Sequence, residues 1–312
     1  MSKARTLATS VGGAAITIFI SMFVVFAGLA AAPGDPVNLI LPRDAPLEQR
    51  AEMREMLGLN DPLFLRFFHW LWSALQGDFG RSLIRKQQVA DMIVARVPTS
   101  ALLIAMAALL IIVFGIGLGM LGGLSPKWRS QVSALIGLGL AIPNFVAAGF
   151  LVIIFSVMLG WFPTYGAGDG FSDRIWHLTL PAIALAISSA AYVAQLSSAA
   201  IAQESEREFV YTSIGRGVPR SRIILVHVMR NSAMPVLTAS GIAVAGLVAG
   251  TVIVEKAFAV SGLGQLLVES VMAKDYPVVQ AISLIVVVTF VAIMTIIDLL
   301  QVAMDPRERG GS

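Results

Sequence analysis

Six long apolar runs alternate with polar segments along the 312-residue chain. The runs cover residues 11–32, 100–123, 134–159, 178–200, 235–254 and 281–303. Each has about the 20 apolar residues that a helix needs to cross the hydrocarbon core of a bilayer. Because backbone polar groups cannot stay unpaired against lipid, each run is predicted to be a helix. The pattern predicts an all-α, polytopic membrane protein with six transmembrane helices.

The segment 33–98, between the first and second runs, is too patterned to be a simple linker. Asp61 and Pro62 are typical of an N-cap and first helical turn, and Trp70 and Trp72 follow. Apolar residues recur beside them at helical spacing: Leu63, Phe64, Phe67, Leu71 and Leu75. We predict a helix that packs against the spans. A position at the membrane interface, where tryptophan is enriched, is the alternative.

The polar segment 201–234, between the fourth and fifth runs, is predicted to form two short helices. Ser205 and Glu208 have the spacing of a capping box. Gly217 suits the left-handed position after a helix, and Pro219 suits the first turn of the next one. The second helix carries these apolar residues before Pro235 opens the next run: Ile223, Leu225, Val226 and Met229. By itself the pattern fits equally a surface for a soluble partner and a solvated loop with chance capping signals.

Composition supports a membrane protein. Hydrophobic residues make up 57% of the chain and charged residues 13%, against about a quarter charged in soluble domains, and the mean hydropathy is +0.82. The absence of cysteine excludes disulfides, thiolate metal sites and cysteine nucleophiles. A net charge of +3 gives no reason to expect a nucleic-acid partner.

The distribution of Lys and Arg predicts the orientation. With the amino terminus inside, the inner segments hold Lys3, Arg5, Lys127, Arg129, Arg207, Arg216, Arg220, Arg222, Arg230, Arg307 and Arg309. The short outer loops then hold only Arg174, Lys256 and Lys274. Both termini and the segment 201–234 are therefore expected in the cytoplasm.

Several motifs match enzymes and cofactor sites but fail on context. Gly117, Gly119 and Gly122 fit G-x-G-x-x-G, yet they lie inside an apolar run and not after a strand. We expect them to allow close helix packing. Gly262-Leu263-Gly264-Gln265 lacks the aspartate of an intramembrane aspartyl protease. The chain has no G-x-x-x-x-G-K-[ST] phosphate loop.

No catalytic residue, metal ligand or bound cofactor is assigned to the chain. His69, His177 and His227 are far apart in the sequence and are interpreted as structural. No charged residue lies in the middle of the second to fifth runs, and only Asp298, in the sixth, offers a carboxylate. Secondary carriers usually need ionisable residues inside the membrane, so the energy for any transport is expected to come from another subunit.

Many short motifs, in order, resemble the inner-membrane permease subunits of ABC importers for dipeptides, oligopeptides and nickel. They are Pro33-Gly34-Asp35-Pro36, Leu57-Gly58-Leu59-Asn60-Asp61-Pro62, Gly77-Asp78-Phe79-Gly80-Arg81-Ser82, Arg96-Val97-Pro98-Thr99, Ile142-Pro143-Asn144-Phe145, Gly160-Trp161-Phe162-Pro163, Phe258, Gly262-Leu263-Gly264, Asp275-Tyr276-Pro277-Val278-Val279-Gln280 and Asp305-Pro306-Arg307. The resemblance covers nearly the whole chain and implies a type I importer permease fold.

The resemblance identifies the polar segment with the family's EAA loop, which docks on the ATPase subunit. The residues that it implies for this coupling are Glu206, Glu208, Tyr211, Thr212, Ser213, Gly215, Arg216, Gly217, Pro219 and Arg220. The chain departs from its relatives at Tyr211, which replaces the glutamate that names the motif, and at Ile214, where relatives carry a basic residue. Specific salt bridges to the ATPase are therefore in doubt, but not docking itself.

The resemblance further implies a division of the chain and a set of partners. Residues 1–32 would hold the cytoplasmic amino terminus and first span, 33–98 an extracytoplasmic segment, 99–303 a five-helix core with its coupling loop, and 304–312 a cytoplasmic tail. The implied partners are a second, similar permease, two ATPase subunits that use ATP and Mg²⁺, and an extracytoplasmic substrate-binding protein. The implied location is the bacterial inner membrane.

The implied substrates are dipeptides and oligopeptides, with nickel or a metal chelate as the alternative and a secondary carrier as a weaker one. Asn144, Gln195 and Gln301 are polar groups at membrane depth, where an unsatisfied amide is costly. Each is expected to face either a wet translocation path or another helix.

Overall fold

The structure of the chain is a computed structural model that describes residues 3–32, 37, 41–42, 44–56 and 58–304. In these residues every regular element is a helix, apart from an isolated bridge between Arg81 and Gln88. The all-α prediction is therefore confirmed. The motif at 33–36, the motif at 305–307 and the tail after residue 304 lie outside the described residues.

Helices account for all six predicted runs. The spans are α1 (Lys3–Ala31), α6 to α7 (Val97–Leu110, η1 Ile111–Gly115, Ile116–Leu124), α8 to η2 (Pro126–Ala141, α9 Asn144–Leu151, Val152–Met158), α10 (Gly170–Ser205), α13 (Met229–Ala257) and α15 (Tyr276–Met304). Shorter helices are α3 (Leu47–Met56), α4 (Leu63–Leu75), α5 (Val89–Val94), α11 (Glu208–Gly215), α12 (Arg220–Arg222), η3 (Ile223–Val228) and α14 (Leu263–Met272). Among the described residues, five helices are long and apolar enough to cross a membrane, and a bent pair supplies the sixth span.

The prediction of one continuous helix over 134–159 is wrong. The chain bends by 98° between α8 and α9. Pro143 has no N–H to donate and forces Ile142 out of the helical region, to φ −92° and ψ 114°. The carbonyl of Ile142 instead accepts a hydrogen bond of 2.8 Å from Ser188 Oγ of α10.

Helix α10 forms the centre of the bundle, with α6, α7, α8, α9 and α13 packed around it. Glycines on α6 to α7 allow this approach. A Cβ on Gly115 would lie 2.9 Å from Val193 Cβ, one on Gly123 would lie 2.8 Å from Ile201 Cβ, and one on Gly119 would overlap with Ser197. The predicted close packing is confirmed at Gly119 and at Gly122, where a Cβ would lie 2.7 Å from Ser198 Oγ, but it is wrong at Gly117, which has nothing within 4 Å of a Cβ.

Helix α4 packs against α1 at the edge of the bundle. Phe67 is fully buried there beside Met22 and Phe26. The favoured packing interpretation is therefore confirmed. The prediction that Asp61 is the N-cap residue of α4 is wrong. Pro62 holds that position, and it makes no side-chain cap bond.

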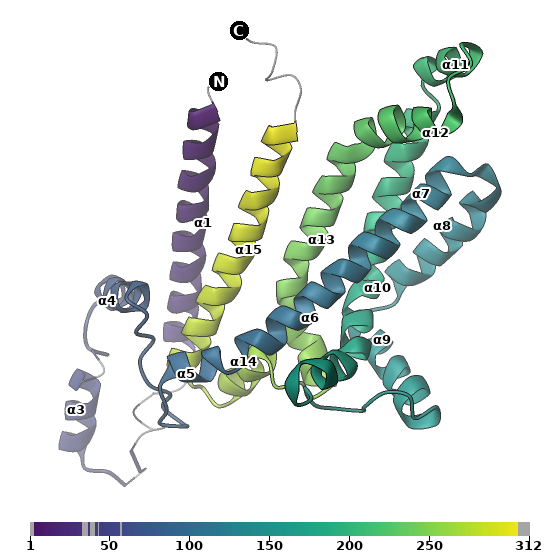
Figure 1. Cartoon of the computed structure of the whole chain (residues 1–312). Coiled ribbons are helices and arrows are strands. Elements are labelled where there is room, and N and C mark those ends of the chain that lie inside the picture. Colours follow the sequence, from purple (N-terminus) through teal and green to yellow (C-terminus); the bar gives the residue numbers. More distant parts are fainter. Residues whose placement is uncertain (1–2, 33–36, 38–40, 43, 57, 305–312) are drawn as a thin grey trace.

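The two ends of the bundle carry different elements (Figure 1). The start of α1 and the end of α15 lie at the same end as α11. Helices α5 and α14 lie at the other end. The arrangement agrees with the expectation that the polar segment and both termini share one side of the membrane.

A matched pair of glycines tests the packing of α7 on α10. Gly119→Ala should lower the stability of the protein, because overpacking costs about 1–3 kcal/mol, a fall in Tm of about 2–5 °C at this chain length. Gly117→Ala should leave the Tm unchanged, since nothing lies within 4 Å of a Cβ there. Thermal unfolding in detergent measures both, and equal Tm values would contradict the packing.

Candidate functional site: a coupling helix and an outer polar cluster

Helix α11 ends in a tight backbone turn. Gly217 has φ +75°, in the left-handed region that favours glycine. Its N–H donates to Ile214 O at 2.9 Å, and Val218 N–H donates to Ser213 O at 3.1 Å. These two bonds form a Schellman motif, which satisfies carbonyls that the helix end leaves free. The predicted helix end at Gly217 is confirmed.

The predicted capping box is absent. Helix α10 runs through Ser205, whose hydroxyl donates to Ile201 O at 2.7 Å within the same helix. The N-cap residue of α11 is Arg207, with no side-chain cap bond. Ser205 therefore cannot cap α11, because its own backbone is still helical.

Apolar contacts fix α11 on the bundle. Val210 is buried with Ile201, Ile223 and Val228 from α10 and η3. The Phe209 ring lies edge-to-face with His227, at 6.0 Å between centroids. These contacts seat one face of α11 and leave the opposite face free.

Most of the predicted coupling residues are exposed, on α11 or in the turns on either side of it. The exposed ones are Glu206, Glu208, Tyr211, Thr212, Gly215, Arg216, Gly217, Pro219 and Arg220, whereas Ser213 is half-buried. Tyr211 is 63% exposed and Ile214 54% exposed.

An ionic network that the sequence reasoning missed braces the base of α11. Glu204 is buried and pairs with Arg207 at 2.9 Å, and Asn231 Nδ2 donates to its other oxygen at 3.3 Å. Glu206 lies 3.6 Å from Arg129 of α8. These two ion pairs and the Asn231 contact connect the start of α8, the end of α10 and the start of α13.

The second short helix is not separate, contrary to the prediction. Helices α12, η3 and α13 continue into one another from Arg220 to Ala257, 38 residues in all. Pro235 lies inside this helix and does not open a new one. A proline is tolerated in a membrane helix where the freed backbone is satisfied locally. The polar segment 201–234 is therefore joined directly to a span.

A buried carboxylate, also missed, lies at the far end of that helix. Glu255 is 0% exposed. One oxygen accepts a bond of 2.6 Å from Ser100 Oγ of α6, and the other accepts bonds from Gly264 N (2.7 Å) and Gln265 N (3.1 Å). Ser100 Oγ in turn accepts Leu263 N at 2.8 Å. The first N–H groups of α14 are thus capped by Glu255 and Ser100.

Asp298 is therefore not the only carboxylate within a long helix. The fifth apolar run appeared to end at residue 254, one residue before Glu255, but α13 continues to Ala257. The Gly-Leu-Gly motif could have indicated this contact, because a Cβ on Gly262 would overlap with the Glu255 carboxylate. Asp298 itself is exposed on α15.

Further contacts hold residues 82–85 against α14 and the turn before α15. Asp275 is buried and accepts hydrogen bonds from Ser82 Oγ and from Leu83 N, the latter at 3.0 Å. Arg85 pairs with Glu269 of α14 at 2.6 Å. These contacts, together with Glu255, fasten both ends of α14.

Two family descriptions match the chain. The binding-protein-dependent transport system inner membrane component matches residues 112–310, and the N-terminal region of such components matches residues 4–104. The chain belongs to this family of transport permeases.

The sequences of individual relatives match that of the permease along nearly its full length. It is 35% identical over 295 residues to the glutathione transport system permease protein GsiC of Shigella flexneri serotype 5b (strain 8401), covering 94% of this chain and 95% of that protein. It is 35% identical over 298 residues to the oligopeptide transport system permease protein AppB of Bacillus subtilis (strain 168), covering 93% of each. These relatives are transport proteins, not enzymes.

A solved structure shares the fold. The inward-facing MetNI methionine ABC transporter (CY5 native crystal form) superposes with a TM-score of 0.56 at 16% identity, over 69% of this chain and 96% of that one. The permease thus has the predicted type I importer fold, and its apolar helices make it a multi-pass inner-membrane protein.

The three candidate path residues of the permease do not form one site. Gln301 Nε2 donates to Thr238 Oγ1 at 2.9 Å, so it faces another helix. Gln195 is exposed on α10. Asn144, at the bend before α9, has a buried Oδ1 with no partner among the described residues. Of the three, Asn144 alone has a buried amide oxygen left free for a ligand or water.

The histidines of the permease also lie apart. His177 Nδ1 lies 3.0 Å from Asp173 O one turn earlier in α10, His227 contacts Phe209, and His69 lines a pocket beside α4. In the described part of the chain, no three His, Asp or Glu side chains gather as a metal site.

Replacement of Glu255 tests the polar cluster that this residue forms with Ser100 and the first N–H groups of α14. Glu255→Ala should destabilise the permease by about 3 kcal/mol, because Ser100 Oγ and two N–H groups of α14 lose their acceptor. Glu255→Gln retains one acceptor oxygen and should cost less. Thermal unfolding and amide hydrogen exchange at residues 263–265 report the effect. Unchanged exchange in Glu255→Ala would contradict the capping role.

Proposed function

We propose that the chain is the translocating permease subunit of an ATP-driven ABC importer for dipeptides and oligopeptides. The observation that carries the proposal is α11, which projects with a free face at one end of the bundle and is joined by the turn at Gly217 to the long helix that ends in α13. The named relatives support peptides as cargo, because they serve glutathione and oligopeptide transport, and glutathione is a tripeptide. Nickel is not favoured, since neither name refers to a metal.

The importer has several subunits. This chain pairs with a second, similar permease, two ATPase subunits bind and hydrolyse ATP with Mg²⁺, and a substrate-binding protein delivers cargo on the outer side. The chain itself binds no cofactor and hydrolyses no nucleotide. The absence of a phosphate-loop motif in its sequence supports this division. Both termini and α11 lie in the cytoplasm, as the basic inner loops predict.

Coupling acts through the long helix of residues 220–257. Its 38 residues span about 57 Å at 1.5 Å per residue. One end carries the turn after α11, and the other carries Glu255, which caps α14 and binds Ser100 of α6. When the ATPase pair closes and moves α11, the helix transmits that displacement to the outer cluster. ATP therefore biases two preformed states, inward-open and outward-open.

Asn144 is the favoured contact for cargo along the path. Its amide oxygen, which has no partner among the described residues, can accept a hydrogen bond from a peptide N–H. Its Nδ2 faces Gly250 of α13, where an added Cβ would lie 3.9 Å away. Polar contacts of this kind, without charge, suit peptides that differ in their side chains.

Uptake by cells tests the cargo. A strain that lacks the chain is compared with the same strain after restoration, using a labelled dipeptide and labelled nickel in parallel. Restored peptide uptake is the expected result. Restored nickel uptake with unchanged peptide uptake would overturn the peptide assignment while leaving the coupling mechanism standing.

A substitution at Gly217 tests coupling. Gly217→Val places a β-branched residue at positive φ, where even an ordinary L-residue costs about 1–2 kcal/mol, and should displace the turn after α11. Uptake should fall by at least about tenfold while the protein remains in the membrane and the ATPase stays active. Gly12→Val, on the exposed face of α1 with nothing near its Cβ, is the control. Normal uptake by Gly217→Val would count against the turn.

A further inference from the structure

A pocket of about 310 Å³ lies between the outer end of α1, helix α4 and the start of α15. Its volume falls in the range of small-ligand sites. The helices that line it, α1, α4 and the start of α15, lie at the edge of the bundle, away from the central helix α10 (Figure 1). The pocket is therefore separate from a path through the bundle core and from the surface of α11.

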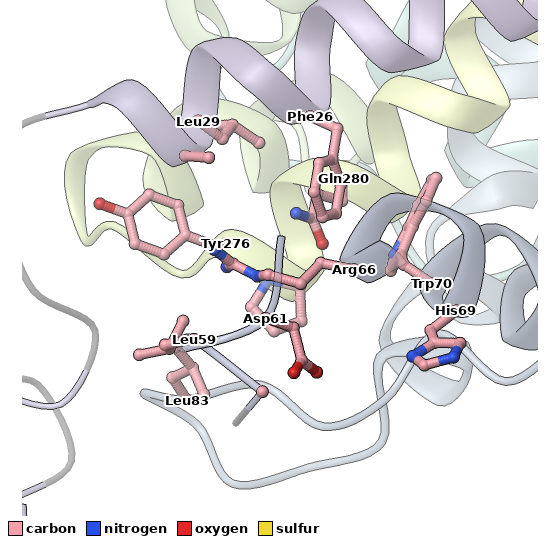
Figure 2. A pocket seen from close by; sticks show the side chains of 13 residues that line it. Phe26, Leu29, Leu59, Asp61, Arg66, His69, Trp70, Leu83, Tyr276 and Gln280 are labelled. Carbon is pink, nitrogen blue, oxygen red and sulfur yellow. The ribbon is translucent and has the colours of Figure 1, made fainter. Parts of the chain in front are cut away.

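Two of the polar side chains that line the pocket, Arg66 and Trp70, can only donate hydrogen bonds. Arg66 is half-buried, and Figure 2 shows its side chain extended across the middle of the pocket. Among the described residues it contacts the Phe26 ring, at 6.0 Å to the centroid, and no carboxylate pairs with it. Trp70 Nε1 is buried and has no acceptor. Asp61 is exposed at the rim, and its carboxylate points away from Arg66 in this view.

The surroundings of the pocket are apolar. Phe26, Leu29 and Leu59 line its wall. The outward face of α4 next to it is rich in large apolar groups, and these are exposed: Phe64, Leu65, Phe68, Trp72 and Leu75. An amphipathic helix with exposed aromatics at the end of a span is typical of the boundary between lipid headgroups and acyl chains.

We propose that this pocket binds one glycerophospholipid, with the phosphodiester on Arg66 and Trp70 and the glycerol and first acyl carbons against the apolar wall. A phosphodiester offers only acceptors and carries one negative charge, which matches a guanidinium and an indole N–H that have no acceptor among the described residues. Its chains lie along the exposed face of α4. The lipid fixes α4, and with it the extracytoplasmic segment, at the membrane surface.

Lipid titration followed by native mass spectrometry tests the site. The full-length protein is purified in detergent, stripped of lipid and titrated with dioleoylphosphatidylglycerol or with dioleoylglycerol, which has the same chains but no phosphate. Arg66→Gln should weaken the phospholipid by about tenfold, equivalent to about 1.4 kcal/mol, and leave dioleoylglycerol unchanged. Arg81→Gln, exposed in the same segment but outside the pocket, is the matched control and should bind like the parent.

Soluble ligands distinguish other occupants. Neither sn-glycerol 3-phosphate nor dialanine should compete at the concentrations at which the lipid binds. Equal phospholipid affinity of Arg66→Gln and Arg81→Gln would overturn the proposal, as would Arg66-dependent binding of dialanine, which makes the pocket a peptide site. Glycerol phosphate binding as tightly as the lipid would also overturn the lipid as occupant.

A conservative variant keeps the test decisive should Arg66→Gln not purify as a monodisperse protein. Trp70→Phe retains an aromatic ring beside Phe26 and Phe67 and removes the N–H donor together with one ring of the indole. Phospholipid affinity should fall by about threefold, as expected for one neutral hydrogen bond. Unchanged affinity would contradict the assignment of Trp70 as a donor to the phosphate and would overturn the site.

Discussion

A backbone polar group inside a membrane must find a partner within the protein, and the other features of this permease follow from that constraint. Each break in a long helix is matched by a specific donor or acceptor. At the bend before α9, Ser188 satisfies the carbonyl that Pro143 displaces. At the start of α14, Glu255 and Ser100 accept the first N–H groups. The bundle can therefore bend and reverse without exposing backbone to lipid.

The same constraint connects the two ends of the permease. The chain reaches α11 through α10 and leaves it through a single helix that returns to the outer side. Helix α11 rests on a small apolar cluster, so its free face can bind a partner without unfolding the bundle. Glu255, at the other end of the same helix, contacts both α6 and α14. The turn after α11 and the contacts of Glu255 thus lie at the two ends of one helix.

Much of this architecture was predictable from the sequence. Apolar run length fixes the spans, because helix geometry and bilayer thickness leave few alternatives. Gly217 was predictable as a helix end since few residues other than glycine adopt positive φ readily. The close approach of α7 to α10 was predictable from Gly119 and its neighbours for a similar steric reason.

Tertiary contacts decided what the sequence could not. Ser205 has the spacing of a cap but lies inside α10, because the packing of Ile201 and its neighbours extends that helix. Pro143 signals a possible bend, but only its contact with Ser188 shows how the bend is satisfied. Glu255 resembles an ordinary charge after a span until Ser100, more than 150 residues away, is placed beside it.

Site-specific cross-linking in the assembled transporter tests the central claim, that α11 is the docking element for the ATPase. The chain has no cysteine, so one introduced at the exposed Tyr211 provides a unique reactive group on the free face. A second cysteine is introduced on the ATPase subunit, in the surface expected to receive α11. We then expect a cross-link whose yield changes when ATP is added. A cysteine at the exposed Trp128, in the first turn of α8, is the control. Absence of a cross-link at position 211 in a complex that still transports would contradict the account.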